Sequence, residues 1–326
     1  MKLDGQPVKA NHFIYKTLII NTMMAMQQPN LSQQAAQMIE RELNYVMQAQ
    51  IAYLEGDRMH PFLEEIVSLM CTLTEAKRSY SQALYFWHHL LGIQERIYGQ
   101  DRRELATVHR KLAVMYSYVG QPKRSFKYFE KSIELLHKWV DEAKADGTKP
   151  EEIKEMKKDL SSIYLQAYFA ANDSNDIPAA IEKIKKVTAI KTDLFGDQTQ
   201  EVVSNHFLTA QSEMRVGRFA DALASNEKVM AGIEGIKGEL GEDFAVVVSK
   251  FYKQQADLAF VTGNLELAKT ASEKSLELIK QIDTNEADTK QASLQTQRDM
   301  LNLLTRVRAR LENRKAAEIR QEIARE

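Results

Sequence analysis

The sequence predicts an all-α fold in which antiparallel helix pairs stack along one axis and a long C-terminal helix closes the stack. Three observations support this prediction. The 326 residues include only six prolines and 13 glycines, which is few for a chain with long loops or many β-turns. Apolar residues recur at helical spacing on both sides of short turns, as in LAVMYSYVGQPKRSFKYFEKSI (112–133). The same arrangement of small and turn residues returns several times along the chain.

Bulk composition limits the classes of partner and compartment. The formal net charge is −1, so no overall field favours nucleic acid or a membrane surface, and a nucleic-acid partner is not expected. The single cysteine, Cys71, excludes an intrachain disulfide framework and a four-cysteine zinc site. A cytoplasmic or other reducing compartment therefore fits the composition.

The most apolar stretch is FIYKTLIINTMMAM (13–26). It contains Lys16 and Asn21 and is too short to span a bilayer, so no transmembrane segment is expected. Asp4 is the only acidic residue among the first 39, but the stretch lacks the arginines typical of a transit peptide. A mitochondrial location without a cleaved presequence therefore stays open as an alternative.

A small residue recurs near the start of the second helix of each predicted hairpin, and these residues are separated by 42, 55, 42 and 46 positions. These second-helix residues are Ala83, Ser125, Ala180, Ala222 and Ala268. The turn residues five positions earlier are Arg78, Gly120, Asn175, Gly217 and Gly263. The first-helix residues twelve positions earlier are Cys71, Ala113, Tyr168, Ala210 and Ala256. Antiparallel helices approach closely only where side chains are small, and glycine or asparagine suits a helix end that enters a left-handed conformation. A single hairpin cannot bury its whole apolar face, so neighbouring hairpins must stack.

Ala113, Gly120, Ser125 and Phe129 follow the spacing of tetratricopeptide repeats, which the chain resembles over residues 62–281. The linkers IQERIYGQDRRELATVHRKLAVMY and IKTDLFGDQTQEVVSNHFLTAQ are similar to the extended second helix, glycine stop and acidic link of the 42-residue repeats of kinesin light chains. The resemblance implies a right-handed superhelical solenoid of antiparallel helix pairs. The chain lacks an N-terminal heptad segment, so it is not expected to be a kinesin light chain itself.

Two segments depart from the repeat pattern. Residues 141–153 form an insertion of 13 residues, in which Thr148 and Glu151 are expected to cap the next helix, with Pro150 in its first turn. The stretch AGIEGIKGELGED (231–243) has closely spaced glycines but no preceding strand, so it is not a dinucleotide-binding loop. We expect this stretch to be a loosened or frayed helix end.

The pattern divides the chain into three parts. Residues 1–60 are expected to form a degenerate helical hairpin, with QQPNLSQQ as its turn and Gly56 near its exit, and residues 61–283 the repeat array. Residues 284–326 are expected to form a long capping helix with an arginine-rich end. The apolar stripe of this helix consists of Leu294, Met300, Leu301, Leu304 and Val307.

The sequence contains no pattern that supports catalysis, a metal centre or a cofactor. None of the seven histidines has the His-Glu-x-x-His spacing of a zinc protease or another recognised ligand spacing. His88 and His89 are adjacent, so on a helix their side chains point about 100° apart. His109 and His206 occupy the same position in their repeats and are interpreted as packing residues. We therefore expect no enzymatic activity, no cofactor and no small-molecule substrate.

The resemblance also implies a partner-binding surface, because the first helices of tetratricopeptide arrays line a concave groove. The candidate groove residues, carried over by repeat position, are Arg110, Lys111, Val114, Tyr118, Phe207, Gln211, Arg215, Lys250, Lys253, Asp257 and Phe260. This surface is mildly basic with aromatic patches, so we expect an acidic or aromatic peptide as its partner. The alternative is that these residues are merely solvated. The carboxylate clamp of chaperone-binding repeats is absent, since its asparagine positions hold Lys111, Val114, Leu208 and Gln211.

The arginine-rich end is a second candidate contact surface. Its basic residues are Arg306, Arg308, Arg310, Arg314 and Lys315. They suit phosphates or an acidic protein face, but the interleaved glutamates also fit a solvated helix with internal ion pairs.

Three functions are compatible with these features. The best supported is a non-catalytic scaffold for protein–protein interaction, acting as a structural subunit of a larger multiprotein assembly. The alternative is a peptide-binding adaptor that recognises cargo or partners in the concave groove, as the kinesin-light-chain resemblance implies. A regulatory or RNA-binding role rests on the arginine-rich end alone.

Overall fold

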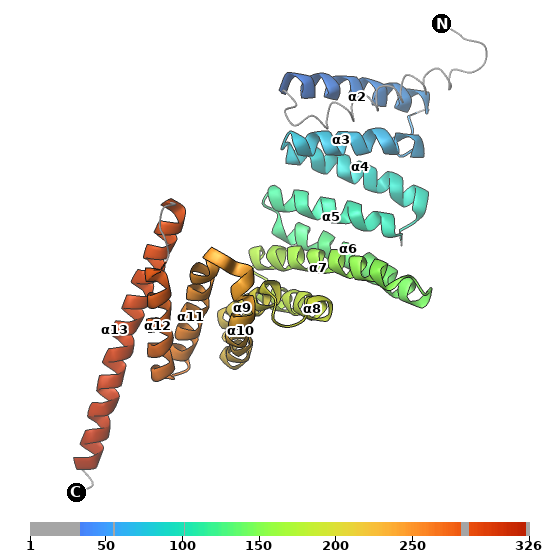
Figure 1. Cartoon of the computed structure of the whole chain (residues 1–326). Helices are drawn as coiled ribbons and strands as arrows, with labels where there is room; N and C mark the ends of the chain where they lie inside the picture. The colour runs from blue at the N-terminus through green and yellow to red at the C-terminus, as the bar shows by residue number, and fades with distance from the viewer. Residues whose placement is uncertain (1–32, 55, 101, 282–286, 324–326) are drawn as a thin grey trace, which may run out of the picture. The chain divides into compact units, whose positions relative to one another are not determined.

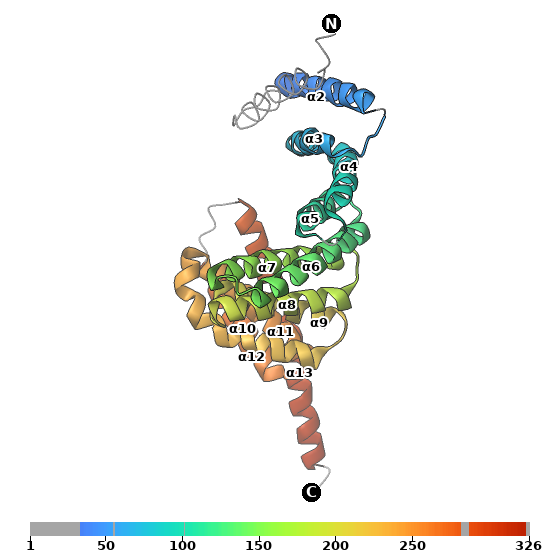
Figure 2. The same ribbon diagram turned by 90° about the vertical axis from the view of Figure 1, so that its right-hand side faces the viewer.

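The computed structural model describes residues 33–54, 56–100, 102–281 and 287–323. These residues are helical apart from short turns, and they divide into two compact units, one ending at Ser174 and the other beginning at Asn175. Within each unit, consecutive helices lie side by side (Figures 1 and 2). The predicted all-α architecture of stacked helix pairs is confirmed. The predicted boundaries at residues 60 and 283 remain predictions.

The first unit contains six α-helices within the described residues and one short 3-10 helix. They are α2 (Gln33–Tyr53), η1 (Pro61–Leu63), α3 (Glu64–Ala76), α4 (Tyr80–Tyr98), α5 (Arg103–Tyr118), α6 (Pro122–Ala145) and α7 (Pro150–Asp173). A continuous apolar core joins α2 to α5 and includes the fully buried side chains of Leu43, Met70 and Leu112.

The second unit also contains six α-helices within the described residues and one short 3-10 helix. Its elements are α8 (Ile177–Phe195), α9 (Gln200–Arg215), α10 (Phe219–Leu240), η2 (Gly241–Asp243), α11 (Phe244–Val261), α12 (Leu265–Lys280) and α13 (Ala287–Ile323). One apolar cluster joins α9, α10 and α11 around Val203, Ile236 and Phe251. Another joins α11, α12 and α13 around Ala256 and Met300.

All five predicted turn residues have the left-handed backbone conformation. Their φ angles are 55° at Arg78, 71° at Gly120, 62° at Asn175, 75° at Gly217 and 83° at Gly263. The residue after such a turn residue closes the preceding helix through its backbone, as where the Gln121 N–H donates to Tyr116 O at 2.9 Å. This confirms the turn positions read from the repeat.

The small residues at the helix crossings are buried, as the repeat pattern predicts. Ala83, Ser125, Ala180, Ala222 and Ala268 on the second helices, and Cys71, Ala113, Ala210 and Ala256 on the first helices, all have no exposed surface. The Ser125 hydroxyl is hydrogen-bonded to the Ser117 hydroxyl at 2.7 Å, so this polar side chain is satisfied where it is buried. Tyr168, the one large residue in the set, is also buried.

Three helices of the first unit have direct counterparts in the second unit at an offset of 97 residues. Helix α8 begins and ends 97 residues after α4, and α9 begins and ends 97 residues after α5. Helix α10 begins 97 residues after α6. Positions in these two triplets of helices can therefore be compared residue by residue.

The insertion at 141–153 lengthens two helices instead of forming a loop. Helices α6 and α7 each contain 24 residues, and Pro150 is in the first turn of α7 as expected. The predicted cap by Thr148 and Glu151 is wrong, because Lys149 precedes the helix and no side chain caps it. The Thr148 N–H instead donates to Ala143 O at 3.0 Å and closes α6, which moves the start of α7 one residue later.

The glycine-rich stretch at 231–243 is not frayed, which corrects a second prediction. Helix α10 continues through this stretch to its last residue, Leu240, and Gly241, whose φ is 51°, is its C-cap residue. A Cβ atom at Gly232 would lie 2.4 Å from Val203 Cγ2, and one at Gly235 would lie 2.8 Å from Gln198 Cβ. Two of the glycines therefore let α10 pack closely against α9 and the turn before it.

At the N-terminal end, Gly56 lies just beyond α2 with a φ of 86°, as expected for the exit of this segment. The first helix of the predicted hairpin, the apolar stretch 13–26 and most of the predicted turn lie outside the described residues.

At the C-terminal end, α13 packs on α11 and α12, and the predicted capping helix is confirmed. Met300, Leu304 and Val307 are buried as expected. Leu294 and Leu301 are 45% and 50% exposed, which corrects their assignment to the stripe, and Leu303 is buried instead.

Candidate partner-binding groove

The first unit contains an open cavity of about 720 Å³ that is lined mainly by the first helices of its hairpins. It is lined by Glu75, Ala76, Arg78, Tyr80, Thr107, Arg110, Lys111, Val114, Met115, Tyr118 and Gln166. We call this surface the first-unit groove. All four candidate groove residues from α5 line it, and their assignment to partner binding remains a prediction.

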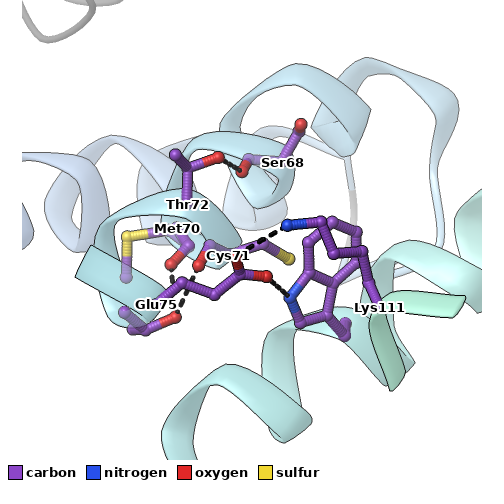
Figure 3. A network of polar contacts seen from close by, with 8 residues as sticks. Ser68, Met70, Cys71, Thr72, Glu75 and Lys111 are labelled. Atoms are coloured by element: carbon purple, nitrogen blue, oxygen red, sulfur yellow. Dashed lines mark hydrogen bonds and ion pairs between the residues drawn. The ribbon is translucent and has the colours of Figure 1, made fainter. Parts of the chain in front are cut away.

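Lys111 is held in a network at one side of the groove. Its Nζ lies 2.8 Å from Glu75 Oε2, and the Trp87 indole N–H donates to Glu75 Oε1 at 2.7 Å. The same ammonium lies 5.7 Å from the centre of the Trp87 ring. Figure 3 shows Lys111 reaching from α5 toward Glu75 on α3. The charge of Lys111 is therefore already compensated within the chain, and its main role is to join α3, α4 and α5.

Cys71 lies beside this network (Figure 3) and has no exposed surface. Burial raises the pKa of its thiol, with the Glu75 carboxylate adding to the increase. The thiol is therefore a packing group and not a nucleophile.

The Arg110 side chain lines the groove and reaches from α5 to α7. Its guanidinium donates to Gln166 Oε1 at 3.1 Å and to Ser162 Oγ at 3.3 Å. Both acceptors are neutral, so the hydrogen bonds fix the side chain without cancelling its charge. Because this fixed guanidinium has no carboxylate partner among the described residues, it is suited to an acidic group on a ligand.

Two aromatic rings form the apolar part of the groove. Tyr80 of α4 and Tyr118 of α5 stack with their ring centres 4.3 Å apart and their planes 15° apart, and Tyr118 is 60% exposed. Arg78 lies in the adjacent turn and is exposed. The repeat positions gave no indication that Arg78 and Tyr80 line the groove. The signal in the sequence that could have indicated Arg78 is that an arginine stands at a left-handed turn position where three other repeats have glycine.

The candidate residues on α9 and at the start of α11 do not form a comparable surface. Phe207 packs against Phe251, with ring centres 5.1 Å apart. Gln211 and Lys250 are exposed, and the Arg215 guanidinium donates to Asn175 Oδ1 at 3.4 Å. These residues line none of the described cavities.

The remaining candidates on α11 lie against the capping helix. Lys253 Nζ is 3.6 Å from Asp257 Oδ2 on its own helix and 3.4 Å from Asp299 Oδ2 on α13. Burial raises the pKa of Asp257, against the opposing effect of Lys253. Phe260 is 6% exposed and therefore buried. Helix α13 thus occupies the surface that the repeat pattern left open on α11.

The basic residues of α13 take part in the same contact. The guanidinium carbons of Arg306 and Arg310 lie 4.6 Å and 4.2 Å from the centre of the Phe260 ring. Two candidates that the sequence suggested separately, the groove of the last repeat and the basic end, therefore meet in one intrachain interface. Arg308 is exposed, Arg314 pairs with Glu318 at 3.2 Å, and Lys315 lines a small cavity beside the turn at Asn264.

Of the two histidines interpreted as packing residues, His109 is buried and His206 is only half-buried. His109 is buried against the Tyr128 ring, and burial lowers its pKa to about 4. His206 is half-buried and lines a cavity of the second unit.

Among the described residues no group of three or more His, Cys, Asp or Glu side chains is placed to hold a metal ion. No helix in the described part of the chain is long and apolar enough to cross a membrane.

A solved structure of similar fold supports the architecture described above. No family model matches the sequence, and no curated protein matches it. The solved structure of BtubC (BKLC) from P. vanneervenii is similar at 12% identity and a TM-score of 0.50, covering 83% of this chain and 93% of that one. A kinesin-light-chain-type protein of P. anserina with nearly identical TPR-like repeats is similar at 14% identity and a TM-score of 0.47, covering 67% and 96%.

Proposed function

We propose that this chain, which has the tetratricopeptide-repeat fold, is a non-catalytic scaffold for protein–protein interaction and a structural subunit of a larger multiprotein assembly. The observation that carries the proposal is the first-unit groove. It combines the exposed Tyr118 ring, the exposed Arg78 and the fixed guanidinium of Arg110 in one open surface. Aromatic and arginine side chains are the residue types that dominate binding energy in protein interfaces.

The chemistry of the groove favours a particular kind of partner segment. Arg78 and Arg110 have no carboxylate partner among the described residues, so their guanidinium groups are available to pair with acidic side chains of a partner protein. The stacked rings of Tyr80 and Tyr118 offer a flat apolar face to an aromatic or proline side chain. A segment that carries both acidic and aromatic residues would use the whole groove.

The capping helix supports the subunit role over a single-site binder. Beyond Leu311, the described side chains of α13 are exposed on every side of the helix, and Figure 1 shows this part extending past α12. Isolated helical segments of this length are only marginally stable in water. A neighbouring subunit that packs against this segment would hold it in place, which gives the chain a second contact surface.

The alternative function is a peptide-binding adaptor. Its support is the asymmetry between the units, because α13 covers candidate groove residues on α11 while the first-unit groove is open. An open groove of this size suits recognition of one short motif. In that case the groove alone would account for all partner binding.

Purification of the tagged protein from its native source tests these functions. Mass spectrometry of the partners is carried out at low and high salt for the wild type and Arg78→Glu. Lys127→Glu, at an exposed position on a second helix, is the matched control. A fixed set of partners at matched stoichiometry that survives high salt supports a built-in subunit. Substoichiometric partners lost at high salt and in Arg78→Glu support the adaptor. Unchanged partners in Arg78→Glu would remove the groove from both proposals.

A further inference from the structure

The second unit contains a cavity of about 560 Å³ between α8, α9 and α10. Its lining includes Thr188 of α8, His206 and Thr209 of α9, and Ser225, Lys228 and Gly232 of α10. These residues lie on different helices from the first-unit groove, so the cavity is independent of the proposed scaffold function. Its volume is in the range of small-molecule sites.

The equivalent position in the first unit, 97 residues earlier, is filled by an aromatic ring. Tyr128 stacks on Tyr116 with ring centres 5.4 Å apart, and its ring lies 5.8 Å from His109 and 5.7 Å from His88. The ammonium of Lys131 lies 5.7 Å from the centre of the Tyr128 ring. Side chains of the chain itself therefore complete this region in the first unit.

The second unit replaces this filling with small and polar residues. Ser225 stands where the first unit has Tyr128, and Gly232 stands where it has Leu135. Thr188 and Thr209 stand where it has the buried residues Leu91 and Leu112. The imidazole and the lysine are retained as His206 and Lys228. Two of the four groups around the Tyr128 ring are thus kept in the second unit, while Glu213 and Lys185 stand where the first unit has Tyr116 and His88, and the ring itself is absent.

The other repeats show that such a ring is the rule at this place. At the two repeat positions held by His109 and Tyr128, every other repeat supplies a phenyl or phenol ring, namely Phe86, Tyr128, Tyr164 and Tyr252. In the last repeat, Lys274 lies 5.3 Å from the centre of the Tyr252 ring, as Lys131 lies over Tyr128. Only the repeat with His206 and Ser225 has the lysine without such a ring.

We infer that the cavity between α8, α9 and α10 binds a small phenolic ligand, whose ring takes the place of the missing tyrosine side chain beneath Lys228. The ammonium of Lys228 is exposed and has no ion pair among the described residues, so it is available for a cation–π contact. Lys185, by contrast, is paired with Glu213 at 2.6 Å. His206 offers its imidazole ring to the ligand ring, as His109 does to Tyr128.

The hydroxyl groups of the cavity favour a ligand that donates a hydrogen bond. The Thr188 and Thr209 hydroxyls already donate to Ile184 O and Asn205 O, each at 2.8 Å. The Ser225 hydroxyl donates to Glu213 Oε2 at 2.8 Å. Toward a ligand, these three oxygens can therefore only accept, and a phenolic O–H is the donor that matches them. This distinguishes a phenol from an unsubstituted aromatic ring.

Binding of p-cresol, which is the tyrosine side chain as a free molecule, tests the inference on the full-length chain by NMR titration. Toluene is the comparator without the hydroxyl. We expect saturable binding of p-cresol, and binding of toluene weaker by roughly fivefold because one hydrogen bond is lost. Absence of saturable p-cresol binding, or toluene binding as tightly, would overturn the inference.

Three variants locate the site. Ser225→Tyr supplies the ring within the chain and is expected to abolish p-cresol binding. Lys228→Gln changes an exposed residue, leaves the fold intact and is expected to weaken binding by roughly twofold to fivefold. Lys131→Gln makes the same change over the filled position of the first unit and is expected to bind p-cresol as the wild type does. Equal binding by Ser225→Tyr, or equal weakening by the two lysine variants, would place any binding outside this cavity and overturn the inference.

Discussion

Gly232 of α10 lies so close to Val203 of α9 that a Cβ atom at position 232 would come within 2.4 Å of Val203 Cγ2. Val203 is fully buried, and its branched side chain has little freedom to rotate away. The close packing of this repeat therefore depends on the absence of a side chain at position 232.

Gly232→Ala is expected to destabilise the second unit by about 1–2 kcal/mol, because overpacking outweighs the gain in helix propensity. Gly238→Ala is the matched control on the same helix, since nothing lies within 4 Å of its added Cβ. It is expected to stabilise the protein by about 0.5–1 kcal/mol. Urea unfolding of both variants measures the difference. Stabilisation by both substitutions would mean that α9 and α10 are not in close contact at Gly232.

Arg78 is a non-glycine residue with a φ of 55°, in a turn where three of the other four repeats have glycine. Arg78→Gly is expected to raise the free energy of unfolding by about 1 kcal/mol, because it removes the strain of the left-handed conformation. Asn175→Gly, at the other non-glycine turn, is expected to gain less because asparagine tolerates this conformation. Thermal unfolding of the two variants checks the order. A loss of stability in Arg78→Gly would show that the side chain supports the fold and not the groove.

His109 gives the protein a defined sensitivity to acid. Burial, together with Lys131 and His88, lowers the pKa of its imidazole to about 4, below the usual value of 6.5. Between these values the unfolded chain binds more protons than the folded chain, so stability falls as pH falls from about 6.5 to about 4. The loss from this residue is on the order of 3 kcal/mol.

His109→Phe keeps a ring against Tyr128 but cannot titrate. Denaturant unfolding of this variant at several pH values is expected to show a shallower fall in stability over that interval than the wild type shows. Parallel curves for the two proteins would rule out His109 as the source of the sensitivity.

The capping helix has two parts with different structural roles. Met300, Leu303 and Val307 are buried on α11 and α12, and burial of each such side chain contributes about 1.5–3 kcal/mol. A chain ending at Gln281 is therefore expected to lose solubility and the protection of α11 and α12 against hydrogen exchange. A chain ending at Glu312 keeps these buried residues and loses a segment whose described side chains are exposed, so it is expected to unfold within about 0.5 kcal/mol of the wild type. Equal effects of the two truncations would contradict this division.

The sequence located the repeat turns and crossings because these depend on local backbone geometry. A left-handed helix end favours glycine or asparagine, and a close crossing favours a small residue, so Gly120 and Ser125 are visible in the sequence. The same logic missed Gly232, because a helical glycine that makes room for Val203 has the same sequence signature as a helix end that frays.

The candidate site was less predictable because it depends on contacts between distant residues. Repeat position places Lys111 in the groove, but the carboxylate that compensates it comes from Glu75 of the preceding hairpin. Likewise, nothing in the local pattern of α11 indicates that Asp299 of α13 lies beside Lys253. Arg110 is the favourable case, since the neighbouring helix supplies only neutral acceptors and leaves its charge available.

We expect a protein partner to contact the first-unit groove. Site-specific photo-crosslinking in the native host tests it directly, with a photoreactive phenylalanine analogue at Tyr118 in the groove and at the exposed position Lys127 on α6 as the control. We expect a crosslinked protein of defined mass from position 118 that is absent from position 127. The same crosslinked products from both positions, or none from position 118, would contradict it.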